Sequence, residues 1–172
     1  LLEFSNKWEQ LSATSLRLDG CPKEWQDYWG VESYYDAAQK KHILLLPTAH
    51  GLAELSIQGQ ALKYTVEYHK GLGRCLGKPV YWNNHIYVPM DVNGKVEIWD
   101  HFDKSYVELS SEVSIQYFYY AVFDNRNLIW LSEQGQCVLT LGIDNKVSVK
   151  FMPWLPIYQP DFNFGSPFMD KE

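Results

Sequence analysis

Cysteine is scarce in this 172-residue chain, and acidic residues outnumber basic ones. Cys21, Cys75 and Cys137 are an odd number of widely spaced cysteines, so they predict neither a disulfide framework nor a cysteine-based metal site. Two alternatives stay open: three reduced thiols, which counting alone favours, or one bridge and one buried thiol. With 15 basic and 21 acidic residues the formal net charge is −6. This charge argues against a nucleic-acid partner and against docking on anionic lipid, because both require basic side chains.

Long hydrophobic runs are also missing. The longest, residues 117–123, has the length of a strand and not the ~18–20 residues of a membrane span, so no membrane insertion is predicted. The chain does not begin with Met, which predicts a processed chain or a part of a longer protein. Low cysteine content fits the cytoplasm. The missing Met and an amphipathic opening segment favour an extracytoplasmic (periplasmic or extracellular) domain beside a membrane anchor.

Aromatic and apolar residues are abundant. Apolar residues make up 46% of the chain, which predicts a folded domain with a core. Aromatic residues make up 16%, with seven Trp and twelve Tyr, and large flat side chains at this density suit sheets and recognition surfaces.

Three segments share one pattern when they are aligned on Gly51, Gly94 and Gly135, which lie 43 and 41 residues apart. The second and fourth positions after each glycine are apolar, as a half-buried strand requires. These positions are Ala53 and Leu55, Val96 and Ile98, and Cys137 and Leu139. Another apolar run precedes each glycine, and the glycine stands where a tight turn is expected to need a positive φ.

The pattern extends outward in both directions. A polar turn and an aromatic strand precede each hairpin, and a second turn and an alternating strand follow it. The sequence therefore predicts an all-β fold of antiparallel four-stranded units at residues 31–68, 79–109 and 117–152.

A four-stranded unit with a period near 40 residues resembles the blade of a β-propeller of the WD, kelch or sensor-propeller kind. The resemblance covers residues 31–152 and lies in period and strand pattern. The diagnostic motifs are absent: "IWD" at 98–100 is a single Trp-Asp dipeptide, and the double glycine of kelch is missing. A plain β-sandwich or open barrel is the alternative.

The resemblance implies blades packed as a partial or small propeller-like assembly. Three blades do not close a ring, since propellers have about 4–8. Either residues 1–30 and 153–172 contribute strands to a fourth blade, or the remaining blades come from a partner. We therefore expect a dimer or a heteromer, held by outer sheet faces that carry Tyr34 and Tyr35 at one end. At the other end these faces carry Val147, Val149 and Phe151.

The two ends of the chain have sequence patterns that differ from those of the repeats. Leu1, Phe4, Trp8 and Leu11 recur at spacings of three and four, which predicts a short amphipathic helix over residues 2–12, followed by a linker to residue 30. Four prolines at residues 153–172 predict an extended tail, because proline cannot donate to a strand ladder. The tail aromatics expected to pack on a blade or a partner are Trp154, Tyr158, Phe162, Phe164 and Phe168.

No catalytic residue, metal site or cofactor is predicted. The glycines of "KGLGRCLGK", residues 70–78, have the wrong spacing for a dinucleotide loop and precede a strand, so we interpret the segment as an inter-blade loop with Arg74 as an anion contact. The five histidines show no metal-ligand spacing. Cys75 beside Arg74 suggests an activated thiol, but no base can be assigned to it. Glu54 and Glu97 are expected to be exposed carboxylates on strand faces.

The remaining candidates lie on the predicted loop face, since loops on a rigid scaffold carry function. The predicted binding residues are His50, Asp91, Asn93, Glu133, Gln134, His69 and Arg74. The leading hypothesis is a non-enzymatic recognition or sensor domain that acts through protein contact, as part of a larger protein or complex, with a small-molecule ligand also allowed. The alternative is a propeller-fold hydrolase or lyase for a carbohydrate or other small polar substrate, which requires a pocket around Asp91, His50 and Glu133.

Overall fold

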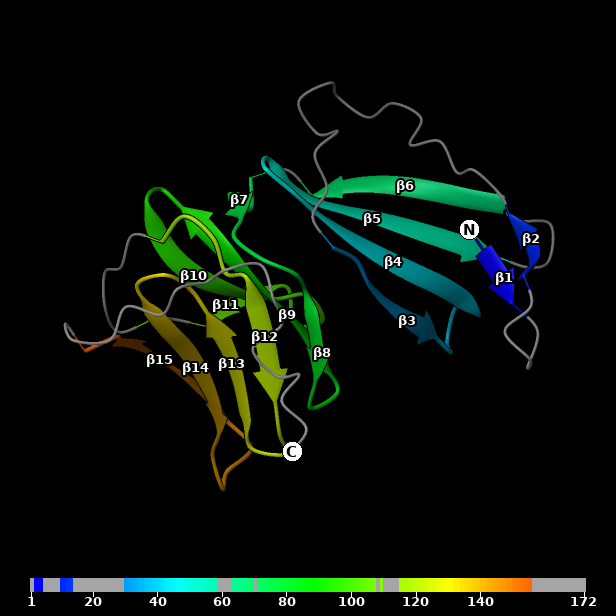
Figure 1. Ribbon diagram of the computed structural model, residues 1–172. Helices are drawn as coiled ribbons and strands as arrows, with labels where there is room; N and C mark the ends of the chain where they lie inside the picture. The colour runs from blue at the N-terminus through cyan, green and yellow to red at the C-terminus, as the bar shows by residue number, and fades with distance from the viewer. Residues whose placement is uncertain are drawn as a thin grey trace.

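The computed structural model describes residues 2–4, 10–13, 30–58, 63–69, 71–107, 109 and 115–155. In these residues the chain is all-β (Figure 1), as predicted. Their secondary structure is made only of strands and turns, so no helix among them is long and apolar enough to cross a membrane.

Three antiparallel sheets follow one another along the chain. The first contains, in spatial order, β3 (Glu32–Asp36), β4 (Lys41–Thr48), β5 (Gly51–Gln58) and β6 (Lys63–His69). The second contains β7 (Arg74–Cys75), β8 (Val80–Trp82), β9 (His85–Val92), β10 (Lys95–Asp100) and β11 (Ser105–Val107). The third contains β12 (Tyr120–Phe123), β13 (Asn127–Leu131), β14 (Gly135–Leu141) and β15 (Val147–Pro153).

The second sheet is built on its longest strand, β9. β10 pairs with one edge of β9, while β7 and β8 both pair with the other edge, β7 opposite its end and β8 opposite its start. β7 and β8 thus act together as one interrupted strand. The third sheet is a plain meander in the order β12-β13-β14-β15.

The predicted N-terminal helix is wrong. Leu2–Phe4 forms β1 and Gln10–Ala13 forms β2, and the two strands pair antiparallel, with Leu2 opposite Ala13 and Phe4 opposite Gln10. A helix of about eleven residues is marginal in water, because nucleation costs more than so few hydrogen bonds return. The paired strands satisfy their backbone groups across the hairpin instead.

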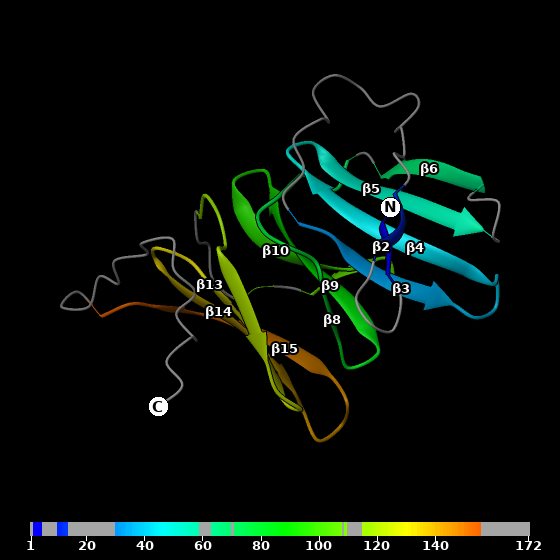
Figure 2. The same ribbon diagram turned by 45° about the vertical axis from the view of Figure 1, so that its right-hand side comes forward.

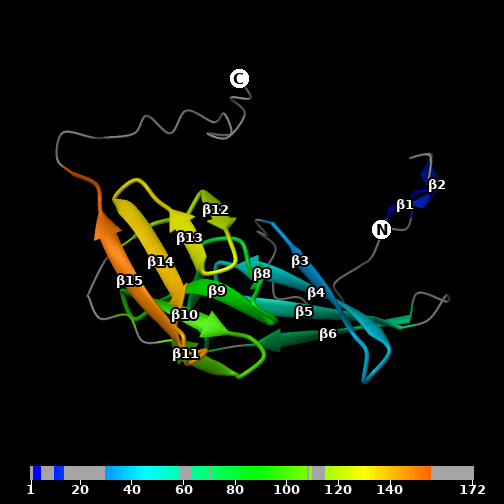
Figure 3. The same ribbon diagram turned by 90° about the horizontal axis from the view of Figure 1, so that it is seen from below.

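The second sheet is covered on both faces, since it lies between the first and third sheets (Figures 2 and 3). One face of β9 and β10 packs on the first sheet through Ile86, Val88 and Trp99, which meet Ile43 and Leu45. The opposite face forms a second core with the third sheet, and its buried members include Tyr87, Trp82, Phe118, Ile98 and Trp130. The six apolar positions predicted after the three glycines are all buried.

The three central hairpins share a side chain that caps the turn three residues before the aligned glycine. Thr48 Oγ1 donates to the carbonyl of Gly51 at 2.8 Å, and Ser132 Oγ donates to the carbonyl of Gly135 at 2.8 Å. Asp91 Oδ1 instead accepts the N–H of Gly94 at 2.8 Å. Each of these side chains thus ties the two ends of its turn together by a hydrogen bond to the backbone.

The glycines themselves serve two different purposes. Gly94 lies inside its turn with φ of +81°, as expected for a position that favours glycine. Gly135 begins β14, and a Cβ there would lie 2.4 Å from the carbonyl oxygen of Met152. Glycine is therefore required at position 135 because the backbone of β15 approaches closely, and not because of a positive φ.

The outward-facing residues predicted for the third sheet are wrong. Val149 is opposite Leu139 in the ladder, so both point toward the second sheet, where Val149 is buried and Val147 and Phe151 pack beside it. At the other end Tyr34 packs against the core shared with the second sheet, whereas Tyr35 is 54% exposed. Alternation along a strand separates its two faces but does not say which face a neighbouring sheet covers.

The outer face of the third sheet carries a different apolar set, all half-buried: Tyr120, Val122, Ile129, Leu131, Val138 and Met152. Trp154, the one predicted tail aromatic within the described residues, lies just after β15. Its Nε1–H donates to the carbonyl of Ser132 at 2.9 Å. The other tail aromatics, the linker and Cys21 lie outside the described residues.

Candidate functional site

The predicted loop-face residues lie at the turns and strand ends, but they do not converge on one pocket. His50, Asn93, Glu133 and Gln134 are exposed in their hairpin turns. Their contacts are local: Gln134 donates its backbone N–H to Ser132 Oγ at 3.3 Å, and Glu133 accepts the hydroxyl of Tyr119 at 2.6 Å. The hydrogen bond to Glu133 raises the pKa of Tyr119 above its ordinary value.

Arg74 and Asp91 are brought together by the pairing of β7 with β9. They are opposite each other in the ladder, and Arg74 Nη2 lies 3.4 Å from Asp91 Oδ2. The Arg74 guanidinium also lies 5.4 Å from the ring centre of Tyr117. Gly73 makes this pairing possible, because a Cβ there would stand 2.1 Å from the carbonyl oxygen of Asp91. The glycine-rich segment therefore brings two backbones together.

The suggestion that Cys75 is an activated thiol is wrong. Cys75 is fully buried, and burial raises the pKa of its thiol to about 12. Arg74 does not counter this effect, because adjacent residues of a strand point to opposite faces and Arg74 pairs with Asp91 instead. Cys137 is likewise a free, buried thiol whose pKa burial raises to about 12.

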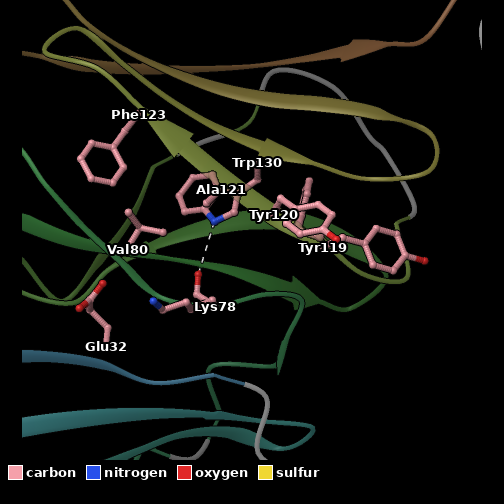
Figure 4. A pocket seen from close by; sticks show the side chains of 9 residues that line it. Glu32, Lys78, Val80, Tyr119, Tyr120, Ala121, Phe123 and Trp130 are labelled. Carbon is pink, nitrogen blue, oxygen red and sulfur yellow. Dashed lines mark hydrogen bonds between the residues drawn. The ribbon is translucent and has the colours of Figure 1, made fainter. Parts of the chain in front are cut away.

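One pocket lies between β8 of the second sheet and β12 of the third (Figure 4). It has a volume of about 280 Å³ and is lined by Glu32, Lys78, Val80, Phe118, Tyr119, Tyr120, Ala121, Phe123 and Trp130. Trp130 is one of the lining residues, and its Nε1–H donates to the carbonyl of Lys78 at 3.4 Å. Phe123 is 62% exposed and Tyr119 is 42% exposed, which is unusual for side chains of this size.

The lining of this pocket is mostly aromatic, and Lys78 and Glu32 supply one charge of each sign at the rim. Such a pocket suits an apolar or aromatic group flanked by polar ones.

A second, shallower pocket of about 330 Å³ lies between the first and second sheets. Its lining consists of Ser33, Tyr34, Tyr35, Tyr81 and Phe102. Glu32 joins the two sheets beside it, because the N–H of Tyr81 donates to Glu32 Oε2 at 3.3 Å. Neither pocket is lined by His50, Asp91 or Glu133, the residues on which the hydrolase or lyase alternative depends.

A cluster that the sequence did not predict lies inside the interface of the first and second sheets. Glu54 of β5, His69 of β6 and His101 of the turn after β10 meet there, with Glu54 Oε2 at 3.2 Å from His69 Nε2 and 3.1 Å from His101 Nε2. The two imidazole rings cross edge to face, 5.6 Å between centres. Glu54 was expected to be exposed, but its side chain is only 16% exposed because the second sheet covers this face.

Electrostatics within the cluster follow from these contacts. Hydrogen bonds from His101 and His69 hold the pKa of Glu54 well below its ordinary value, so Glu54 is ionised. Burial lowers the pKa of His101, which favours its neutral form. Burial and the charge of Glu54 raise the pKa of nearby Tyr34 to about 12. The three side chains lie on separate elements, so no local spacing in the sequence indicates them.

No family model matches the chain, and no curated protein matches it. Its function is therefore inferred from its own geometry.

Proposed function

We propose that the chain is part of a propeller-like assembly and works as a recognition module that binds protein. Three successive antiparallel sheets support this reading, since each packs face to face on the next. Strands of all three sheets, among them β3, β8 and β12, contribute to the pocket of Figure 4. This arrangement is what blades around a common axis would give.

The outer face of the third sheet is the observation that carries the proposal. Val122, Ile129 and Val138 form one cross-strand row, and Tyr120 and Leu131 belong to the next. All five are half-buried and apolar. Contiguous apolar surface of this kind marks interaction sites in folded proteins.

The pocket and this outer face are continuous around the edge strand β12. Tyr120 belongs to both, because it lines the pocket and shares the outer face with Leu131. Exposed Phe123 and Tyr119 extend the aromatic surface on the pocket side. A partner that covered the outer face with a sheet of its own and placed a side chain in the pocket would use both features.

A second copy of the chain is the partner that the purified protein can test. A standard interface buries about 800 Å² per partner, and apolar burial contributes about 25 cal/mol per Å². We expect light scattering at micromolar concentration to give a mass near twice the 20.1 kDa of one chain. Val138→Lys should return the mass to one chain, because it places a charge in the apolar row.

Ser105→Lys is the matched control, since it adds the same charge at an exposed position of the second sheet. It should leave the mass of the assembly unchanged. A wild-type chain that stays at 20.1 kDa across the concentration range would contradict self-association through this face.

A further inference from the structure

We propose that Glu54, His69 and His101 form a binding site for a divalent transition-metal ion of the zinc class. Two imidazoles and one carboxylate are a ligand set that such ions accept, with a fourth position left for water or another ligand. The potential ligand atoms of the three residues all lie within 4.8 Å of one another.

The distances suit tetrahedral coordination. Bonds of 2.0–2.1 Å to nitrogen and oxygen place neighbouring ligand atoms about 3.3 Å apart around a tetrahedral ion. Glu54 Oε2 lies 3.2 Å from His69 Nε2 and 3.1 Å from His101 Nε2. An ion therefore needs only small side-chain movements to be held by all three.

The protonation states also suit a metal. A ligating histidine must be neutral and a ligating carboxylate ionised. Burial favours neutral His101, and its two histidine neighbours keep Glu54 ionised. The other nitrogen of His69, Nδ1, lies 3.7 Å from Oε1 of the exposed Glu67, which would need to move closer to act as the outer-shell partner that metal-bound histidines have.

The cluster is only partly open to solvent. His101 is 1% exposed, whereas Glu54 and His69 are each 16% exposed. Lys104 Nζ lies 3.3 Å from His101 Nε2 and serves as the cation near Glu54. Lys104 is exposed and can move away, so a metal ion would replace its ammonium group.

A second group with ligand-like spacing, His85, Asp100 and Asp103, provides a comparison within the same chain. Here Asp100 Oδ1 accepts the N–H groups of Phe102 and Asp103 at 3.0 and 3.2 Å, and Asp100 Oδ2 lies 2.8 Å from His85 Nδ1. Asp100 is thus already engaged as the cap of its turn. His85 therefore serves as a matched control histidine.

The test is titration of the full chain with Zn²⁺ by calorimetry, and with Co²⁺ by visible absorption, which reports tetrahedral coordination. We expect one equivalent to bind, with affinity lowered at least tenfold in Glu54→Gln and in His69→Gln. Lys104→Met should raise the affinity, because it removes the competing cation. His85→Gln should bind like the wild type.

Circular dichroism of each variant separates loss of ligand from loss of fold. If one of the two ligand variants unfolds, the other still tests the site. Lys104→Met gives a further test, because it leaves all three proposed ligands in place. Absence of a one-equivalent binding event in the wild type, or equal affinity in wild type and folded His69→Gln, would overturn the proposal. So would loss of binding in His85→Gln alone.

Discussion

The two interfaces of the second sheet are built on different principles. The interface with the third sheet is apolar: its buried core of thirteen residues contains Trp82 and Trp130, and both indole N–H groups donate to carbonyl oxygens. The interface with the first sheet has a smaller apolar core of eight residues and also encloses Glu54, His69 and His101. One interface should therefore contribute stability regardless of pH, whereas the other depends on protonation.

The polar interface also has a less complete set of hydrogen bonds. The indole nitrogen of Trp99 is buried without a hydrogen-bond partner among the described residues, although its ring packs 5.0 Å from that of Tyr106. An unsatisfied buried donor costs about 1–3 kcal/mol. The comparison teaches that the two interfaces of a sheet covered on both faces can contribute differently to its stability.

The largest effect is expected from Trp130→Ala in the apolar interface. Trp130 is 1% exposed, and truncating a buried tryptophan costs about 3–5 kcal/mol. Urea unfolding should show this loss to be the same at pH 7 and pH 5. Phe123→Ala is the control on the same sheet, because Phe123 is 62% exposed and its removal should change stability by less than about 0.5 kcal/mol. A loss of stability in Trp130→Ala that differs between pH 7 and pH 5 would contradict the contrast between an apolar and a pH-dependent interface.

A smaller, pH-dependent effect is expected from Glu54→Gln in the polar interface. The folded protein lowers the pKa of Glu54, so the stabilisation is fully present above its ordinary pKa of 4.5 and is lost progressively as the pH falls from that value toward the lower pKa of the folded state. We expect a loss of about 1–3 kcal/mol at pH 7. The difference between wild type and variant should shrink as the pH is lowered from 7 to below 4.5, because the stabilisation is lost toward the low pKa of folded Glu54. A difference that stays constant over this range would contradict this assignment.

Thiol labelling can compare the interfaces directly, because each contains one buried cysteine. Cys75 belongs to the core shared with the first sheet and Cys137 to the core shared with the third. Burial raises the pKa of both thiols to about 12, so each reacts only when its interface opens. In a Cys21→Ser background we expect Cys75 to be modified roughly tenfold faster, equivalent to about 1.4 kcal/mol. Faster labelling of Cys137 would reverse the ranking.

The smallest effect is expected from Trp99→Phe. The substitution removes an indole N–H that has no partner and keeps an aromatic ring beside Tyr106. Relief of the unsatisfied donor should offset the lost volume, leaving the free energy of unfolding within about 1 kcal/mol of wild type. Trp130→Phe is the matched comparison, since it loses a hydrogen bond as well as volume and should cost more. Equal losses of unfolding free energy in Trp99→Phe and Trp130→Phe would show that hydrogen bonding of the indole N–H does not account for a difference between the interfaces.

The strands could be predicted from the sequence because their information is local. Alternation at Val96 and Ile98, and at Cys137 and Leu139, identified positions that are buried in the structure. The N-terminal helix failed because a few apolar spacings of three and four do not exclude a hairpin. The predictions for Glu54 and Val149 failed because alternation along a strand does not tell which face another sheet covers.

The candidate site could be predicted only in part. The pairing of Arg74 with Asp91 depends on β7 lying along β9, and the aromatic pocket depends on strands from three sheets. Glu54, His69 and His101 come together only through the packing of two sheets. None of these distances is encoded in a short motif.

Strand β9 cannot find its register from its own hydrophobic pattern. Residues 86–90 are buried in succession, so sliding the strand by one residue would exchange one apolar face for another at little cost in burial. The turns at its two ends supply the missing information. Asn83 and Asn84 have φ of 49° and 61°, and Asn93 and Gly94 have φ of 55° and 81°, which are the signs of two-residue hairpin turns of the primed type. Four small turn residues therefore decide which of its side chains meet the first sheet and which meet the third.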